Sequence, residues 1–128
     1  MQRYLSMLLL FMAVTFHAAA QGPVMTLETD NHNFGQINEG EKAEYEFEFT
    51  NTGDAPLVIS DISRTCGCTT PSYSKDPVMP GEKGKIKVVF DSEGRPGRFH
   101  KSITVTTNEK GNSRNQIYLR GQVMTKGG

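Results

Sequence analysis

The sequence lacks the motifs that most often mark an enzyme. Its 128 residues contain no glycine-rich phosphate loop, no His-Glu zinc motif and no nucleophile elbow around a serine. It also has no block of lysine and arginine, and its formal net charge is +0. Such a chain has no electrostatic footprint for nucleic acid. We therefore predict a non-enzymatic protein that uses no cofactor and binds no nucleic acid.

Long apolar runs are scarce too, and one stands at the start of the chain. Arg3 precedes an apolar stretch from Leu5 to Phe16, and Ala18–Ala20 then supply the small residues that a signal peptidase requires. The run is shorter than the roughly 20 apolar residues of a membrane-spanning helix, which disfavours the alternative of an uncleaved anchor. The pattern predicts a cleaved signal peptide over residues 1–20, a domain over residues 21–128, export to the periplasm or beyond, and no membrane span after cleavage.

Helical periodicity is missing after residue 20, and alternation takes its place. Between residues 43 and 50 apolar and polar residues alternate strictly, which puts on one face of a strand Ala43, Tyr45, Phe47 and Phe49. The intervening glutamates are expected on a solvated outer face of the sheet rather than in a cation site; they are Glu44, Glu46 and Glu48. Phe47 lies in the middle of the apolar face and is predicted to be buried between two sheets.

Further strands are expected on both sides of this one. Apolar or alternating segments lie at residues 24–29, 34–37, 56–63, 85–91, 99–107 and 116–123. Residues 30–33 are predicted to form a turn, and residues 73–76 an irregular segment. About seven short strands, separated by turn signals at intervals of about ten residues, predict an all-β fold, an immunoglobulin-like sandwich of antiparallel strands. A small β-barrel is the alternative.

Both cysteines lie in the stretch from Arg64 to Thr70, one glycine apart. In an extended strand, residues i and i+2 point to the same face with their Cα atoms roughly 6.7 Å apart, close to the upper limit of about 6.8 Å for a disulfide. Gly67 gives the backbone the freedom to bring Cys66 and Cys68 closer. A disulfide between them would close a very small ring, so we expect it to be strained, easily reduced and of little value for stability.

The cysteine pair has three alternative interpretations. In the first it is a structural feature of a bend, since cysteine often behaves as a small apolar residue. In the second it is a redox-active dithiol, since strained disulfides are the labile ones. In the third it is a soft-metal site, since two thiolates suit Cu(I) or half of a Zn(II) site. The supporting loop would consist of Thr65, Gly67 and Thr69. No zinc motif relates the cysteines to His32 or His100, and each histidine is expected at an exposed strand or turn position.

Several short motifs coincide along the chain. They are Phe34-Gly35, Asn51-Thr52-Gly53, Pro56-Leu57-Val58-Ile59, Cys66-Gly67-Cys68-Thr69, Pro80-Gly81-Glu82, Gly97 with Phe99, and Leu119 with Gly121 and Val123. Together they resemble the domain-of-unknown-function 1573 family of secreted bacterial proteins, over almost the whole of residues 21–128. That family is similar to the immunoglobulin-like domains of major sperm protein and of cilia-associated proteins. The resemblance implies a seven-stranded sandwich and supplies no activity.

Two function hypotheses from different classes follow. The first is an exported, non-enzymatic immunoglobulin-like module of the bacterial cell envelope, with a binding or structural role. Its partner would be a protein or an envelope glycan, engaged by loops or by a sheet edge. The alternative is a periplasmic thiol redox or copper-handling protein that uses Cys66-Gly67-Cys68. Accessible, reactive thiols are needed by the second hypothesis and not by the first.

Overall fold

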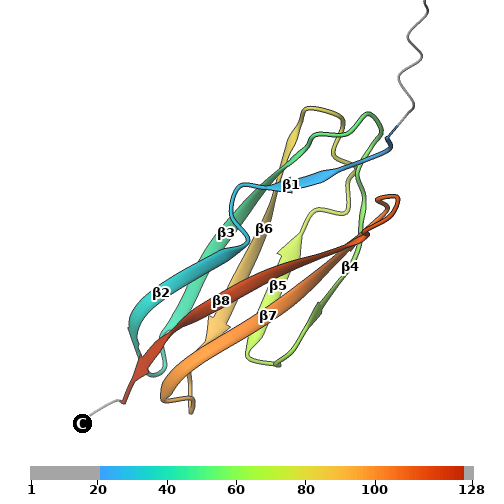
Figure 1. The fold of residues 1–128 in the computed structure, drawn as a ribbon. Helices are drawn as coiled ribbons and strands as arrows, with labels where there is room; N and C mark the ends of the chain where they lie inside the picture. The colour runs from blue at the N-terminus through green and yellow to red at the C-terminus, as the bar shows by residue number, and fades with distance from the viewer. Residues whose placement is uncertain (1–20, 126–128) are drawn as a thin grey trace, which may run out of the picture.

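Figure 1 shows the fold, a computed structural model in which residues 21–125 are described. The described residues contain no helix, so none there is long and apolar enough to cross a membrane. The predicted signal peptide, residues 1–20, lies outside the described part of the chain. The strands are β1 (Met25–Leu27), β2 (Asn31–Asn38), β3 (Lys42–Asn51), β4 (Ile59–Arg64), β5 (Thr69–Tyr73), β6 (Lys83–Asp91), β7 (Gly97–Thr107) and β8 (Arg114–Met124).

The strands form two four-stranded sheets that pack face to face (Figure 1). Sheet A has the order β1-β3-β6-β5, and sheet B has the order β2-β8-β7-β4. The predicted all-β, immunoglobulin-like sandwich is confirmed, with eight described strands rather than about seven. Neighbouring strands are antiparallel except β2, which runs parallel to β8. This pairing arises because the chain passes from sheet A to sheet B between β1 and β2.

Three edge segments differ from the sequence-based expectation. Residues 31–33, predicted as a turn, belong to β2, which bulges between Asn33 and Gln36. The side chains of this edge strand are mostly polar, so the sequence there lacks the alternation of apolar and polar residues that indicates a strand. Residues 69–73 form the edge strand β5 although it contains Pro71, since an edge strand has backbone groups without a strand partner. Strand β4 begins at Ile59 rather than at residue 56 and bulges before Asp61.

The core lies between the two sheets, and the alternating segments supply it. Seven apolar side chains have no exposed surface, namely Phe47, Ile86, Val88, Phe90, Val105, Ile117 and Leu119. The predicted burial of Phe47 is therefore confirmed. A smaller cluster continues the core at one end and consists of Ile37, Ala43, Cys68, Phe90 and Val123. The cysteine stretch thus takes part in the packing of that end.

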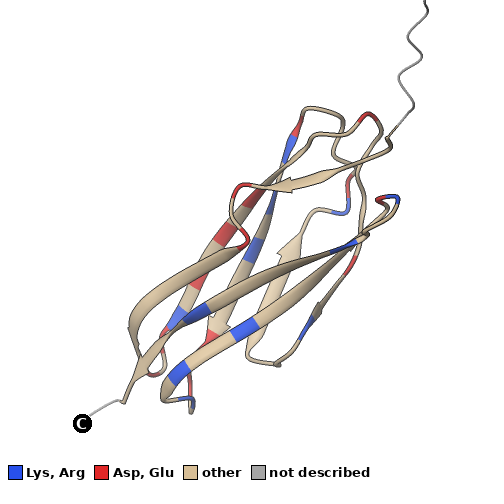
Figure 2. Ribbon diagram, viewed as in Figure 1, with Lys and Arg blue, Asp and Glu red and all other residues tan. Residues whose placement is uncertain are grey.

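The outer face of sheet A carries the three glutamates, as predicted. Each glutamate of β3 meets a lysine of the neighbouring β6, in the ion pairs Glu44–Lys87 (3.3 Å), Glu46–Lys85 (3.7 Å) and Glu48–Lys83 (3.2 Å). Figure 2 shows the opposite charges side by side along the two strands. Exposed pairs of this kind stabilise a protein by at most about 1 kcal/mol each. Their main effect is to leave this face with its charges matched.

A buried asparagine ties together the loops at the end of the sandwich where β3 finishes. Asn51 is wholly buried. Its Nδ2 donates hydrogen bonds to the carbonyl oxygens of Ala55 (2.7 Å) and Val78 (2.8 Å). Its Oδ1 accepts hydrogen bonds from the backbone N–H groups of Gly53 (3.0 Å) and Val24 (3.3 Å). One side chain therefore satisfies polar backbone groups from three separate segments.

Candidate functional site

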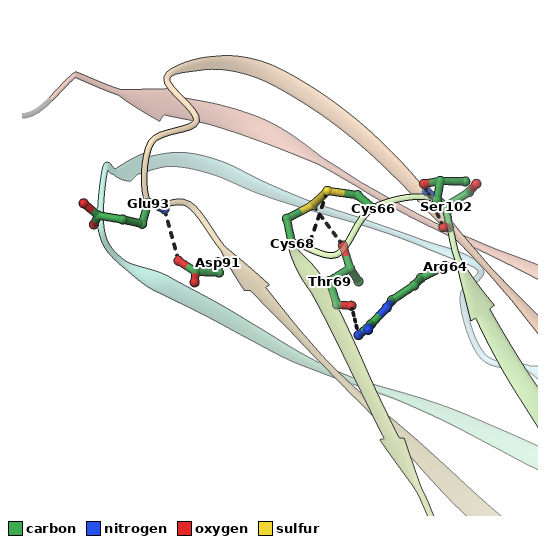
Figure 3. Close-up of a disulfide and its surroundings, with 8 residues drawn as sticks. Arg64, Cys66, Cys68, Thr69, Asp91, Glu93 and Ser102 are labelled. Atoms are coloured by element: carbon green, nitrogen blue, oxygen red, sulfur yellow. Dashed lines mark hydrogen bonds between the residues drawn. A yellow bond between two sulfur atoms is a disulfide. The ribbon is translucent and has the colours of Figure 1, made fainter.

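The first candidate site is the cysteine stretch, which joins β4 of sheet B to β5 of sheet A. Cys66 and Cys68 form a disulfide there, with their Cα atoms 5.1 Å apart (Figure 3). The separation is shorter than in an extended strand because Gly67 and Cys68 form a turn. Cys66 is half-buried, whereas Cys68 is 2% exposed. Cys66 therefore keeps some surface exposed to solvent, whereas Cys68 belongs to the core.

Hydrogen bonds fix the loop on both sides of the disulfide. On the sheet B side, the backbone N–H and the hydroxyl of Thr65 both donate to the carbonyl oxygen of Ser102 in β7, at 3.3 and 3.2 Å. On the sheet A side, Arg64 Nη1 donates to the carbonyl oxygen of Thr69 at 3.0 Å (Figure 3). The Cys68 carbonyl oxygen accepts from the N–H of Asp91 at 2.8 Å. The predicted supporting loop is thus anchored to both sheets.

The two cysteines differ in burial, and this difference affects how the disulfide would react. An incoming thiolate reaches Cys66 more easily, and attack there would release Cys68 as the leaving thiolate. That sulfur lies in an apolar cluster, with the Thr69 hydroxyl 3.6 Å away. Burial of a charge in such surroundings is costly. Burial of Cys68 should therefore slow thiol exchange relative to a fully exposed disulfide.

The two histidines of the domain do not join the cysteines. His32 of β2 lies between the sheets, stacked on Tyr45 at 3.7 Å between ring centroids. Desolvation lowers the pKa of His32 below its usual value. His100 is exposed on β7 and stacks on Tyr118 at 5.7 Å. Within residues 21–125, no three His, Cys, Asp or Glu side chains are placed to hold a metal ion.

A second candidate site, which the sequence alone does not reveal, is an open groove across β2, β8 and β7 of sheet B. We call it the basic groove, and its polar lining residues are Asn33, Gln36, Arg98, His100, Arg120 and Gln122. Its volume is about 540 Å³, within the range of about 300–1,000 Å³ that is usual for ligand sites. All of these side chains are neutral or basic. The groove therefore favours a negatively charged or polar ligand.

Strand register builds the lining of the basic groove in two rows across the sheet. In one row Arg120 of β8 lies between Asn33 of β2 and His100 of β7. In the next row Gln122 lies between Gln36 and Arg98. Side chains directly opposite on neighbouring strands lie about 5 Å apart. A ligand on this face would therefore meet several polar groups at once.

Two glycines allow β2 to lie close against β8 at this position. A side chain on Gly121 would approach the Phe99 ring to 2.8 Å and the Gly35 carbonyl oxygen to 3.0 Å. Gly35 itself has a φ of +69° at the bulge of β2, a conformation that favours glycine. The Phe99 ring stacks on Phe90 in the core at 4.1 Å. Three of the short motifs noted in the sequence thus meet under the basic groove.

The charges of the basic groove are unmatched, in contrast to those of sheet A. Within residues 21–125, neither Arg98 nor Arg120 forms an ion pair or donates a side-chain hydrogen bond. Figure 2 shows basic residues along β7 and β8 without acidic neighbours on the same stretch. Alternation along β7 and β8 places these side chains on the solvent face, opposite to buried residues such as Leu119. The two arginines are therefore free to bind an external anion.

Comparison with known proteins assigns the chain to a family. The family model described as "Protein of unknown function (DUF1573)" matches residues 25–123. The chain belongs to this family. No protein with a curated description matches it. Family membership supports the fold and the resemblance noted in the sequence, and it supplies no activity for either candidate site.

Solved structures of similar fold include bacterial and animal proteins. A protein of unknown function from Porphyromonas gingivalis W83 matches with a TM-score of 0.71 and 22% identity, over 81% of this chain and 48% of that chain. The chain thus spans about half the length of that protein. The ASH/PapD-like domain 7 of human CEP192 matches with a TM-score of 0.66 and 14% identity, over 80% and 86% of the two chains.

A further neighbour is WR4, a member of the MSP family from C. elegans. It matches with a TM-score of 0.55 and 11% identity, over 77% of this chain and 96% of that chain. Identities this low show a shared fold alone.

Proposed function

We propose that the protein is an exported, non-enzymatic binding module of the bacterial cell envelope, and that it engages its partner through the basic groove. The observation that carries the proposal is the contrast between the two outer faces. Sheet A matches its glutamates with lysines, whereas sheet B leaves Arg98 and Arg120 without partners among the described residues. Unmatched arginines beside side-chain amides are suited to recognition of an anion.

Export is supported by two independent features. The first 20 residues have the composition of a cleaved signal peptide. The disulfide between Cys66 and Cys68 fits an oxidising compartment such as the periplasm, because cytosolic thiols are kept reduced. Sequencing of the protein from the periplasm should begin at Gln21. A chain that keeps Met1, or that stays in the cytoplasm, would rule export out.

The thiol redox or copper-handling alternative has less support. Both cysteine sulfurs are held in the disulfide, so neither is available as a thiolate to bind Cu(I). Reduction would in turn require a thiolate at the buried Cys68. We therefore assign the disulfide a structural role, the fixing of the turn in the connection between β4 and β5. As the partner surface we propose the face of sheet B, in place of the loops or sheet edge expected from the sequence.

A binding assay with paired variants tests the proposed function. Fluorescently labelled protein is titrated with envelope fractions of the producing bacterium, and saturable binding is expected. Arg98→Ala combined with Arg120→Ala should abolish this binding. The matched control is Lys85→Ala combined with Lys87→Ala, which removes the same charge from sheet A and should leave binding unchanged. Equal losses in both variants, or no saturable binding by the unmodified protein, would overturn the proposal.

A further inference from the structure

We propose that the ligand of the basic groove is an acidic polysaccharide, a glycan chain that carries carboxylate groups. The proposal rests on the binding function proposed above and names the chemical class of the partner. It combines three requirements that the groove places on an occupant: negative charge, many hydroxyl groups, and a shape that lies along the face of a sheet.

The charge requirement comes from the placement of Arg98 and Arg120. They occupy diagonal positions on the neighbouring strands β7 and β8, since His100 is opposite Arg120 and Gln122 is opposite Arg98. Diagonal neighbours in an antiparallel pair lie roughly 7–8 Å apart. Each guanidinium can bind one carboxylate with two parallel hydrogen bonds. The groove is thus built to hold two carboxylates of one ligand.

The remaining lining residues suit the rest of a sugar chain. Asn33, Gln36 and Gln122 carry amide groups that donate and accept hydrogen bonds, as hydroxyl groups require. The ring of His100 lies nearly parallel to that of Tyr118, with an interplanar angle of 7°, at one side of the groove. Flat rings at an exposed position can pack against the apolar face of a sugar ring. The groove therefore offers contacts for both surfaces of a saccharide.

An acidic peptide fits this position less well. Extended peptides bind β-proteins chiefly by adding a strand to a free sheet edge, where backbone groups have no partner. The basic groove crosses β8, an internal strand whose backbone is paired with β2 on one side and β7 on the other. A peptide lying there would have to leave much of its own backbone hydrogen-bonding capacity to water.

An anionic membrane surface fits less well too. Proteins that bind a lipid surface combine basic residues with apolar side chains that insert between the lipids. Within residues 21–125 the large, exposed apolar side chains are Met79 and Met124. Neither lines the basic groove. A polar, hydroxyl-rich chain is therefore the occupant that the surface favours.

Calorimetric titration with polygalacturonate fragments tests the inference on the purified protein. We expect saturable binding that weakens as salt is added, because the contacts are exposed ion pairs. Arg98→Ala and Arg120→Ala should each lower the affinity about tenfold or more. The variant Gln122→Glu places a negative charge in the second row and should abolish binding. The control Lys85→Ala with Lys87→Ala should keep the affinity within about twofold, and urea unfolding of every variant checks that it folds.

Three outcomes would overturn the inference. Equal affinity for an uncharged glucan would refute the role of charge. Tighter binding of poly-glutamate, or of vesicles rich in anionic lipid, would assign the groove to a peptide or to a membrane. If groove-dependent binding to envelope fractions persists while polygalacturonate does not bind, the glycan assignment fails and the proposed binding function stands.

Discussion

Replacement of Asn51 by alanine should destabilise the protein far more than the loss of an exposed asparagine would. The side chain is wholly buried and makes four hydrogen bonds to backbone groups. Alanine removes all four bonds. It leaves the Ala55 carbonyl oxygen and the N–H groups of Val24 and Gly53 without this partner, whereas the Val78 carbonyl oxygen keeps its hydrogen bond from the Leu57 N–H. Because these groups are partly buried, water replaces the lost bonds incompletely.

The magnitude follows from the number of bonds. A net contribution of about 1 kcal/mol for each hydrogen bond gives a loss of about 4 kcal/mol in the free energy of unfolding. Small domains are stable by only about 5–15 kcal/mol in total. With a urea dependence of about 2 kcal/mol per molar, the unfolding midpoint should fall by about 2 M.

Urea unfolding followed by circular dichroism measures this difference, and Asn108 provides the matched control. Its amide also binds two backbone groups, Val58 N–H at 2.8 Å and Pro56 O at 3.0 Å, but it is exposed. Asn108→Ala should therefore cost less than about 1 kcal/mol, since water can take over its bonds. Equal midpoints for the two variants would refute the argument that burial makes the Asn51 bonds valuable.

Three further predictions concern the core, a histidine and the disulfide. Phe47→Ala should cost about 3–5 kcal/mol and Glu46→Ala within about 0.5 kcal/mol; similar urea midpoints would show that the register is wrong by one residue. Desolvation lowers the pKa of His32 in the folded protein. As the pH falls below about 6.5, this histidine therefore takes up a proton more readily in the unfolded chain than in the folded protein. The free energy of unfolding should decrease from pH 7 to pH 5 for this reason. His32→Phe should remove that part of the pH dependence, and an unchanged slope would contradict this origin. Reduction of Cys66–Cys68 should cost less than about 2 kcal/mol, because the closed loop is so short; a loss of several kcal/mol would refute the entropy argument.

The fold was predictable where one side of a strand is buried. Phe47, Ile86 and Leu119 belong to segments with clear alternation, and all three are wholly buried. Edge strands carry a weaker signal, because few of their side chains face the core. This is why half of β2 and the whole of β5 were absent from the expected strands.

The two candidate sites differed in how much the sequence revealed. Cys66 and Cys68 were found because the chain has two cysteines and their spacing alone brings them together. The basic groove draws on residues 33–36, 98–100 and 120–122, from three strands. Basic residues at alternating positions were visible in the sequence, but their neighbours depend on the strand register and on the parallel pairing of β2 with β8. Local patterns do not encode that register.

The four free edges of the sandwich have a further consequence for the behaviour of the protein at high concentration. An open edge invites other chains to add strands, which leads to aggregates and fibrils. In this sandwich β1 has three residues, β2 and β4 carry bulges, and β5 contains Pro71. Each of these features disrupts the regular row of backbone groups that an added strand would need. We expect the folded protein to resist fibril formation at high concentration, and we do not expect it to act as a template for other copies of the same chain.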